Sequence, residues 1–318
     1  MALSIPAAGL ALLMGTAAAN AADFHWQLPR GFLPPPVPAD NPMSVEKIEL
    51  GRRLFFDTRL SSTGEYSCAS CHRPDLAYTD GRARAVGATG DRLRRSAPTL
   101  INVAYAPRLT WSDPRVRSLE AQMRLPLFNR HPVELGYGID EPRRISAIRA
   151  DREYATLFVQ AFGESAKVVS TDHIIKAIAA FERTLIAAGS PFDRYIFEDD
   201  RAALSPAAKR GMTAFYSPDV GCAACHYGIN FSGTQVTEAQ PRPAKGTRGR
   251  LRVPTLRNVE LTAPYMHDGR IPTLDAALAH DTSRHVALTL EQRHDLLAFL
   301  RSLTDPTFAP SGRIATSP

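Results

Sequence analysis

The stretch YSCASCHRPD, Tyr66–Asp75, contains two cysteines separated by two residues and a histidine directly after the second one. The stretch GCAACHYG, Gly221–Gly228, repeats this pattern, and the two copies use all four cysteines of the chain. Two disulfides or a four-cysteine zinc site would also use four cysteines. Neither alternative requires a histidine directly after each pair, so both explain the pattern less well than a group that needs two thiols and one imidazole.

Two thiols at this spacing add to the two vinyl groups of one porphyrin, and the adjoining histidine becomes an axial ligand of the iron. The sequence therefore predicts two covalently bound c-type haems. The first is held by Cys68, Cys71 and His72, and the second by Cys222, Cys225 and His226.

The length of 318 residues predicts two domains of ordinary size, 22–198 and 199–318. The boundary is placed in the segment SPFDRYIFEDDRAALSP, 190–206. Residues 1–21 form an apolar stretch that ends in Ala-Asn-Ala, a pattern typical of a signal peptide and its cleavage site. We therefore expect the chain to be exported.

The apolar spacing predicts a mainly α-helical protein, with helices over 44–57, 170–189, 205–217 and 289–303. Ser44 and Ser205 are expected N-caps, and Thr289 with Gln292 forms a capping box. Gly189 is the expected terminator of the second helix.

The formal net charge of +6 does not indicate a nucleic-acid-binding protein, because the arginines occur in scattered pairs rather than in one stripe. After the first twenty residues, no apolar run reaches the length of about eighteen residues that a membrane span requires. The basic charge suits an acidic protein partner or haem propionates.

Three further stretches resemble one family, the bacterial di-haem cytochrome c peroxidase and MauG superfamily. They are LGRRLFFDTRLSSTGEYSCASCH at 50–72, VPTLRNVELTAPYMHDGR at 253–270 and LLAFLRSLTD at 296–305. The resemblance covers nearly all of the mature chain. It implies two cytochrome c-like domains with one haem each, the first reactive towards peroxide and the second serving electron transfer, and a periplasmic location. The stretch SLEAQMRLPLFNRHPVELG, 118–136, resembles the MauG-like di-haem enzymes of methanobactin gene clusters.

The resemblance also implies roles for individual residues. Gln122, Pro126 and Glu134 match the distal side of the first haem, although the segment 127–131 sets Glu134 two residues further from Gln122 than in the common pattern. A carboxylate there would move a proton between the two oxygens of peroxide. Trp111 matches a tryptophan that carries oxidising equivalents between the haems.

A calcium site between the domains is also implied, because Asn102, Thr262 and Pro264 match the residues that supply its oxygen ligands. His267 matches a family position near the second haem, where a structural hydrogen bond is the expected role.

Two departures from the peroxidase pattern concern the iron ligands. The segment 73–100 lacks the histidine that blocks the first haem in classical peroxidases, so the first haem is expected to be five-coordinate. The sixth ligand of the second haem would fall at Asp281, where relatives have methionine or tyrosine. His280 is slightly favoured instead, and His285, Asp281 or an open site remain alternatives.

A third departure is Val220, which stands where MauG has a tryptophan that passes oxidising equivalents to its partner. Tyr216 or Tyr227 could replace that tryptophan. The function implied is a MauG-like enzyme that uses hydrogen peroxide to reach a doubly oxidised di-haem state. It then oxidises a residue, expected to be tryptophan converted to kynurenine, on a copper-binding protein. The alternatives are a cytochrome c peroxidase supplied by a small redox protein and a non-enzymatic electron carrier.

Overall fold

The computed structural model describes residues 24–233, 251–282 and 287–308, so the predicted signal peptide and His285 lie outside the described residues. The described residues contain helices and four isolated β-bridges but no strand, which confirms the prediction of a mainly α-helical fold. The α-helices are α1 Val45–Phe56, α2 Cys68–Cys71, α3 Leu119–Phe128, α4 Glu141–Arg149, α5 Arg152–Phe162, α6 Thr171–Arg183, α7 Pro191–Phe197, α8 Pro206–Tyr216, α9 Leu274–Thr282 and α10 Leu290–Arg301.

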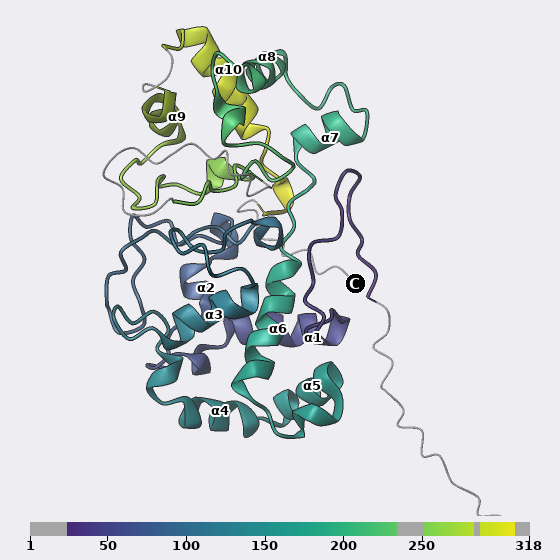
Figure 1. Ribbon diagram of the computed structural model, residues 1–318, viewed down its shortest axis with the longest axis vertical. Coiled ribbons are helices and arrows are strands. Elements are labelled where there is room, and N and C mark those ends of the chain that lie inside the picture. The colour runs from purple at the N-terminus through teal and green to yellow at the C-terminus, as the bar shows by residue number, and fades with distance from the viewer. Residues whose placement is uncertain (1–23, 234–250, 283–286, 309–318) are drawn as a thin grey trace, which may run out of the picture.

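Helices α1 and α6 pack against each other in the lower half of Figure 1. Ser44 caps α1 as predicted, because its side chain accepts a hydrogen bond from the Lys47 N–H. The two helices approach most closely at Gly51, where a Cβ atom would lie 1.9 Å from the Ala177 carbonyl oxygen. The absence of a side chain at Gly51 therefore sets the distance between the two helices.

Helices α8 and α10 form the corresponding pair in the upper half of Figure 1. Both caps are confirmed, Ser205 on α8 and the capping box of Thr289 and Gln292 on α10. This pair also meets at a glycine, since a Cβ atom on Gly211 would lie 1.9 Å from the Asp295 carbonyl oxygen.

Outside the helices, each half of the chain also contains a buried asparagine that makes two hydrogen bonds to a distant backbone segment. The Asn102 side-chain oxygen accepts a hydrogen bond from the Ala187 N–H at 2.6 Å, and its amide group donates to the Ala187 carbonyl at 3.0 Å. Asn258 makes the same pair of bonds with the backbone of Asp305, at 3.2 Å each. Both asparagines have positive φ, 53° and 55°, a conformation that asparagine tolerates better than most residues. The two halves of the chain therefore share one arrangement, which we call the frame: a pair of helices that meet at a glycine, and a buried asparagine that bonds to a distant backbone segment. The glycine and asparagine are Gly51 and Asn102 in the first half and Gly211 and Asn258 in the second.

The buried apolar residues form two clusters, one with members between Leu50 and Ala187 and the other between Phe192 and Leu303. Phe192 on α7 packs with the second cluster, although it precedes the predicted boundary. The domain limits 22–198 and 199–318 stay a prediction.

The helix predicted over 170–189 ends earlier than expected, at Arg183. After Thr184, several backbone groups bond to distant segments. The Leu185 carbonyl accepts from the Asn102 N–H, and the N–H groups of Ala188 and Gly189 donate to the Asp305 carboxylate. Tertiary hydrogen bonds therefore end α6 six residues before its glycine.

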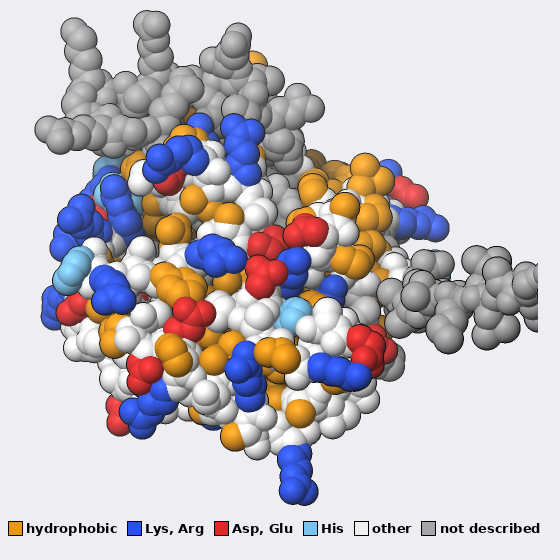
Figure 2. All heavy atoms as spheres, turned by 60° about the horizontal axis from the view of Figure 1, so that its bottom comes forward, with side chains coloured by type: hydrophobic (Ala, Val, Ile, Leu, Met, Phe, Trp, Pro, Cys, Tyr) orange, Lys and Arg blue, Asp and Glu red, His pale blue; other side chains and the backbone are white. Residues whose placement is uncertain are grey.

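No helix among the described residues is long and apolar enough to cross a membrane. On the face shown in Figure 2, basic side chains occur in small groups with acidic ones between them.

The glycine contact of α1 and α6 makes a stability prediction. Gly51→Ala should lower the free energy of unfolding by about 1–3 kcal/mol, because the new methyl group meets a backbone carbonyl that cannot rotate away. Alanine is intrinsically the better helix former, so a loss of stability would identify packing as the cause. Urea denaturation of the holoprotein measures the effect, with Glu46→Ala on the exposed side of α1 as the control. A Gly51→Ala variant as stable as the wild type would contradict this contact.

Candidate haem and peroxide site

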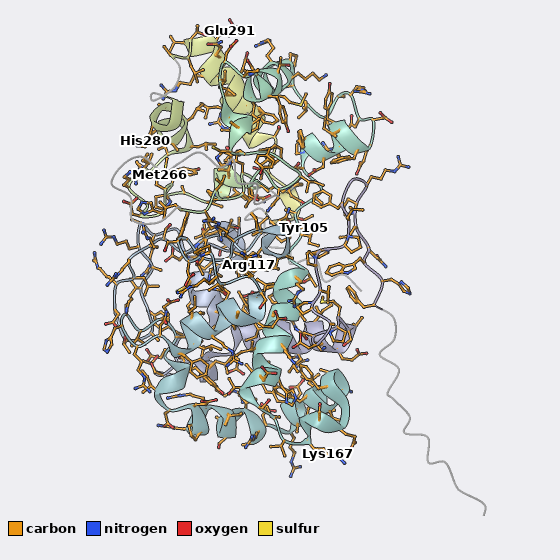
Figure 3. The ribbon with its side chains drawn as sticks, in the orientation of Figure 1. Tyr105, Arg117, Lys167, Met266, His280 and Glu291 are labelled. Carbon is orange, nitrogen blue, oxygen red and sulfur yellow. The ribbon has the colours of Figure 1, made fainter. Side chains whose placement is uncertain are left out.

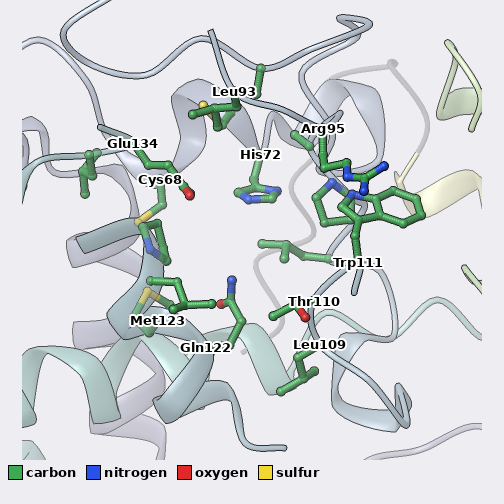
Figure 4. A pocket seen from close by; sticks show the side chains of 18 of the residues that line it. Cys68, His72, Leu93, Arg95, Leu109, Thr110, Trp111, Gln122, Met123 and Glu134 are labelled. Carbon is green, nitrogen blue, oxygen red and sulfur yellow. The ribbon is translucent and has the colours of Figure 1, made fainter. Parts of the chain in front are cut away.

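A cavity of about 330 Å³ lies in the first domain, enclosed by α2, α3 and the segment 93–100, and lined also by Glu182 near the end of α6. It brings together residues that are far apart in the sequence (Figure 4). The sequence-predicted residues that line it are Cys68, Cys71, His72, Trp111, Gln122, Pro126 and Glu134.

The His72 imidazole is oriented by its backbone surroundings. Its Nδ1 lies 3.0 Å from the Tyr78 carbonyl oxygen and donates to it, so Nε2 carries the lone pair that an iron ligand needs. Tyr78 has a φ of 58°, an unusual value for a bulky residue, and this conformation turns its carbonyl group towards the imidazole. Burial lowers the pKa of His72, which keeps the ring neutral and able to bind a metal.

Helix α3 carries Gln122 and Pro126 and is fixed to α6 by a buried ion pair. The Arg183 guanidinium donates to both carboxylate oxygens of Glu120, at 2.7 and 2.9 Å, and Asn41 donates to the same carboxylate at 2.6 Å. Arg183 is only 2% exposed. This buried pair fixes the register in which α3 presents Gln122 to the cavity.

Glu134 reaches the cavity through the turn that follows α3. An isolated bridge between Arg130 and Val133 closes this turn, so the two additional residues of the segment 127–131 do not move Glu134 out of the cavity. The Glu134 carbonyl accepts from the Ala88 N–H at 2.7 Å, and Asn129 donates to the Glu134 carboxylate oxygen Oε1 at 3.3 Å. Burial raises the pKa of Glu134, more than the Asn129 hydrogen bond lowers it. A carboxyl group of this kind is suited to taking up and returning a proton.

Glu182 also lines the cavity, and the sequence analysis missed it. It is 3% exposed, and its Oε2 has no hydrogen-bond partner among the described residues. Burial raises its pKa to about 8. One signal was present in the sequence: position 182 lies four residues after Ile178, on the apolar face of α6, where a charged side chain is unusual.

The second site repeats the histidine geometry of the first. His226 Nδ1 lies 2.8 Å from the Phe231 carbonyl oxygen, and Phe231 has a φ of 48°. Helix α9 carries His280 on the side of the second domain where Figure 3 also labels Met266. The side chain of Asp281 lies outside the described residues, as does His285. The identity of the sixth ligand therefore stays a prediction.

Trp111 lies where the two domains meet. Its indole Nε1 donates to the Ser96 carbonyl at 3.0 Å, and its own carbonyl accepts from the Arg252 N–H at 2.9 Å. The His267 ring contacts the indole edge-on, with 6.4 Å between the ring centroids. His267 thus contacts a residue of the first cavity, and its predicted position near the second haem stays a prediction. Arg252 also lines this cavity and was missed by the sequence analysis.

The side chain of Asn102 makes two hydrogen bonds to the Ala187 backbone, which the second domain repeats at Asn258, so it has a structural role. Thr262 and Pro264 lie just after the 3₁₀ turn Val259–Leu261. The described residues contain no group of three or more His, Cys, Asp or Glu side chains suited to a metal. Calcium at this position stays a prediction.

The residues around the first cavity fit a c-type haem. Cys68 and Cys71 are free thiols on its wall, His72 presents Nε2, and the orphaned Glu182 oxygen faces a space that another group must fill. Two halves with this frame, each with a Cys-x-x-Cys-His motif, define a two-domain c-type cytochrome.

Comparisons with known proteins specify the family. A family model of di-haem cytochrome c peroxidases matches residues 45–201. The chain is 36% identical over 293 residues to the methylamine utilization protein MauG of Methylorubrum extorquens, which covers 84% of this chain and 81% of that protein. It is 33% identical over 327 residues to the cytochrome c551 peroxidase of Pseudomonas aeruginosa, covering 94% and 92%.

A solved structure of a MauG-like protein associated with microbial copper homeostasis is 34% identical to this chain, with a TM-score of 0.80, and covers 91% of this chain and all of that one. The chain therefore belongs to the di-haem cytochrome c peroxidase and MauG family. It is a haem-dependent oxidoreductase that acts on peroxide, with two haems.

The buried Glu182 carboxyl makes a prediction about pH. Because its pKa is raised in the folded state, the folded protein binds a proton more tightly than the unfolded chain does. The free energy of unfolding should therefore fall as the pH rises from the unfolded pKa of about 4.3 to about 8. Glu182→Gln has no carboxyl group to titrate and so lacks this pH-dependent loss. The stability of the variant relative to the wild type should therefore be greater at pH 8 than at pH 5.

Urea denaturation of the two holoproteins at both pH values measures this difference. Glu164→Gln in the exposed turn Gly163–Lys167 is the matched control and should change nothing between the two pH values. An equal difference between Glu182→Gln and wild type at both pH values would contradict the buried, protonated state of Glu182.

Proposed function

We propose that the protein is a periplasmic MauG-like enzyme that uses hydrogen peroxide to oxidise a residue on a separate, copper-binding protein. The oxidised residue is a tryptophan, and the product is kynurenine. Two observations support this proposal. The chain shares its fold and 34% of its residues with a MauG-like protein associated with copper homeostasis, and its first cavity contains a carboxyl group placed for proton transfer.

The strongest support for this proposal is the set of residues that line the first cavity. Among the described residues that line it, His72 is the only histidine. His72 would hold the iron, and no second imidazole of this cavity would compete with peroxide for it. Gln122 and Glu134 point into the space beside the imidazole (Figure 4).

Haem iron, when bound, supplies the electrons that cleave the O–O bond of peroxide. The residues of the chain handle the proton. Asn129 holds Glu134 Oε1, which leaves Oε2 to accept a proton from one oxygen of peroxide and to return it to the other. Gln122 orients the peroxide by a hydrogen bond from its amide group. Pro126 shapes the apolar wall of the same space.

Trp111 contacts both domains, and we assign it the transfer of oxidising equivalents between the two sites. His280 on α9 is the proposed sixth ligand of the second haem, and the proposed calcium ion lies near Asn102, Thr262 and Pro264. From the second haem, Tyr216 is a candidate exit towards the partner protein, because its side chain is 48% exposed.

A cytochrome c peroxidase supplied by a small redox protein is the second candidate, favoured by the 33% identity with the Pseudomonas aeruginosa enzyme. One experiment separates the candidates. Stoichiometric peroxide is added to the fully oxidised holoprotein without reductant, and optical and Mössbauer spectra are recorded. A stable state two equivalents more oxidised supports the proposal, and mass spectrometry of the tryptophan peptides of an added copper-binding partner identifies the product. Reaction only after one haem is reduced indicates the peroxidase, and no reaction in either state indicates an electron carrier.

Glu134→Gln tests the proton-transfer role. Glutamine keeps the shape of the side chain but cannot accept a proton, so the reaction with peroxide should slow by about 10²- to 10⁴-fold. Stopped-flow spectroscopy of the oxidised holoprotein measures the rate, and Glu141→Gln on α4, which does not line the cavity, is the control. An unchanged rate in Glu134→Gln would remove Glu134 from this role.

A further inference from the structure

Trp111 is surrounded by cationic and neutral groups from both domains. The Arg252 guanidinium lies over the indole, 5.5 Å from the ring centroid, and Arg252 is 8% exposed. Its Nη1 donates to the Leu109 carbonyl at 3.3 Å, so its position is fixed by uncharged backbone. Burial lowers the pKa of Arg252 to about 10, which leaves it charged at neutral pH.

Arg95 supplies the second cation. It lines the same side of the cavity as Trp111, opposite Glu134 (Figure 4). One of its guanidinium nitrogens donates to His267 Nδ1. Because a guanidinium group only donates hydrogen bonds, His267 must be neutral, with its proton on Nε2. Two carboxylates of neighbouring segments pair with arginines, Asp268 with Arg270 at 2.9 Å and Asp113 with Arg115 at 2.7 Å, and Asp268 Oδ1 also lies 4.0 Å from His267 Nδ1.

The indole N–H faces no proton acceptor of useful basicity. It donates to the Ser96 backbone carbonyl at 3.0 Å. Ser96 is itself fixed to the second domain, since its N–H donates to the His267 carbonyl at 3.0 Å and its hydroxyl to the Met266 carbonyl at 3.2 Å. An indole that lost an electron here would keep its proton and remain a cation, with the Arg252 guanidinium over its ring and Arg95 on the same side of the cavity. Such a cation is unfavourable, because like charges repel strongly where water is excluded.

We propose that Arg252 and Arg95 hold Trp111 in its reduced form, so that oxidising equivalents cross Trp111 without residing on it and the tryptophan is protected from permanent oxidation. The step is a one-electron transfer: one electron passes from a donor in the second domain, through the indole, to the oxidised site of the first cavity, so that the indole itself stays reduced and no bond forms. Peroxide supplies the oxidising equivalents, so in the working enzyme this role rests on the proposed function.

The first test supplies the oxidant from outside and therefore does not depend on the proposed function. Azide radicals generated by pulse radiolysis oxidise tryptophan, and mass spectrometry of the digested holoprotein gives the oxidised fraction of Trp111. Trp26, the only other tryptophan of the chain, is the internal reference. Arg252→Met should raise the Trp111-to-Trp26 ratio roughly three- to tenfold over wild type, since the cation over the ring is lost.

Arg252→Lys separates charge from access. Lysine keeps the positive charge but fills less of the space over the ring than arginine, so it should leave the ratio near the wild-type value. An equal rise in Arg252→Lys and Arg252→Met would show that access to the ring is the cause and would overturn the proposal. An unchanged ratio in a folded Arg252→Met variant would overturn it as well.

Arg95→Met is the second variant, and Arg95 is a half-buried side chain of the segment 93–100. If Arg252→Met fails to fold, Arg95→Met tests whether a guanidinium group protects Trp111 from oxidation. Its Trp111 ratio should also rise, and an unchanged ratio would overturn the role of Arg95. Repeating the measurement with peroxide in place of azide radicals tests the connection to the enzyme. A rise with azide radicals but none with peroxide would leave the charge effect standing and count against the proposed function.

Discussion

The hydrogen bond between His72 Nδ1 and the Tyr78 carbonyl is the constraint around which the first domain is organised. A histidine that ligates iron must expose Nε2 and stay neutral, and both conditions require its other nitrogen to donate to a fixed acceptor. The acceptor is fixed by a costly backbone conformation, because Tyr78 has positive φ without being glycine. His226 and Phe231 satisfy the same condition in the second domain.

One frame used twice nevertheless yields two different sites. Both halves pair their helices at a glycine and lock their chain with a buried asparagine. The first half adds α3 and the turn after it, which bring Gln122 and Glu134 to the cavity. The ion pair of Arg183 and Glu120 connects α3 to α6. The first cavity therefore contains polar side chains that the shared arrangement alone does not supply.

The frame also explains why charged groups surround Trp111. The segments that enclose it belong to both domains, and each is fixed by backbone hydrogen bonds such as that between the Arg252 N–H and the Trp111 carbonyl. Arg252 is buried because its guanidinium finds carbonyl acceptors and an aromatic face at the junction. A tryptophan at this junction is thus held in position by the same contacts that set its electrostatic surroundings.

The sequence by itself determined the helical class, three of four helix ends and the membership of a di-haem family, and it predicted the haem attachment residues, because these depend on short spacings within one segment. Tertiary structure decided the end of α6, where backbone groups leave the helix to bond with Asn102 and Asp305. It also revealed Glu182 and Arg252 as cavity residues. The cavity is formed by segments that are distant in the chain, so the position of either residue in its own segment does not show that it lines the cavity. Burial, which sets the pKa of Glu182 and the field at Trp111, is a property of the packed molecule and not of any one segment.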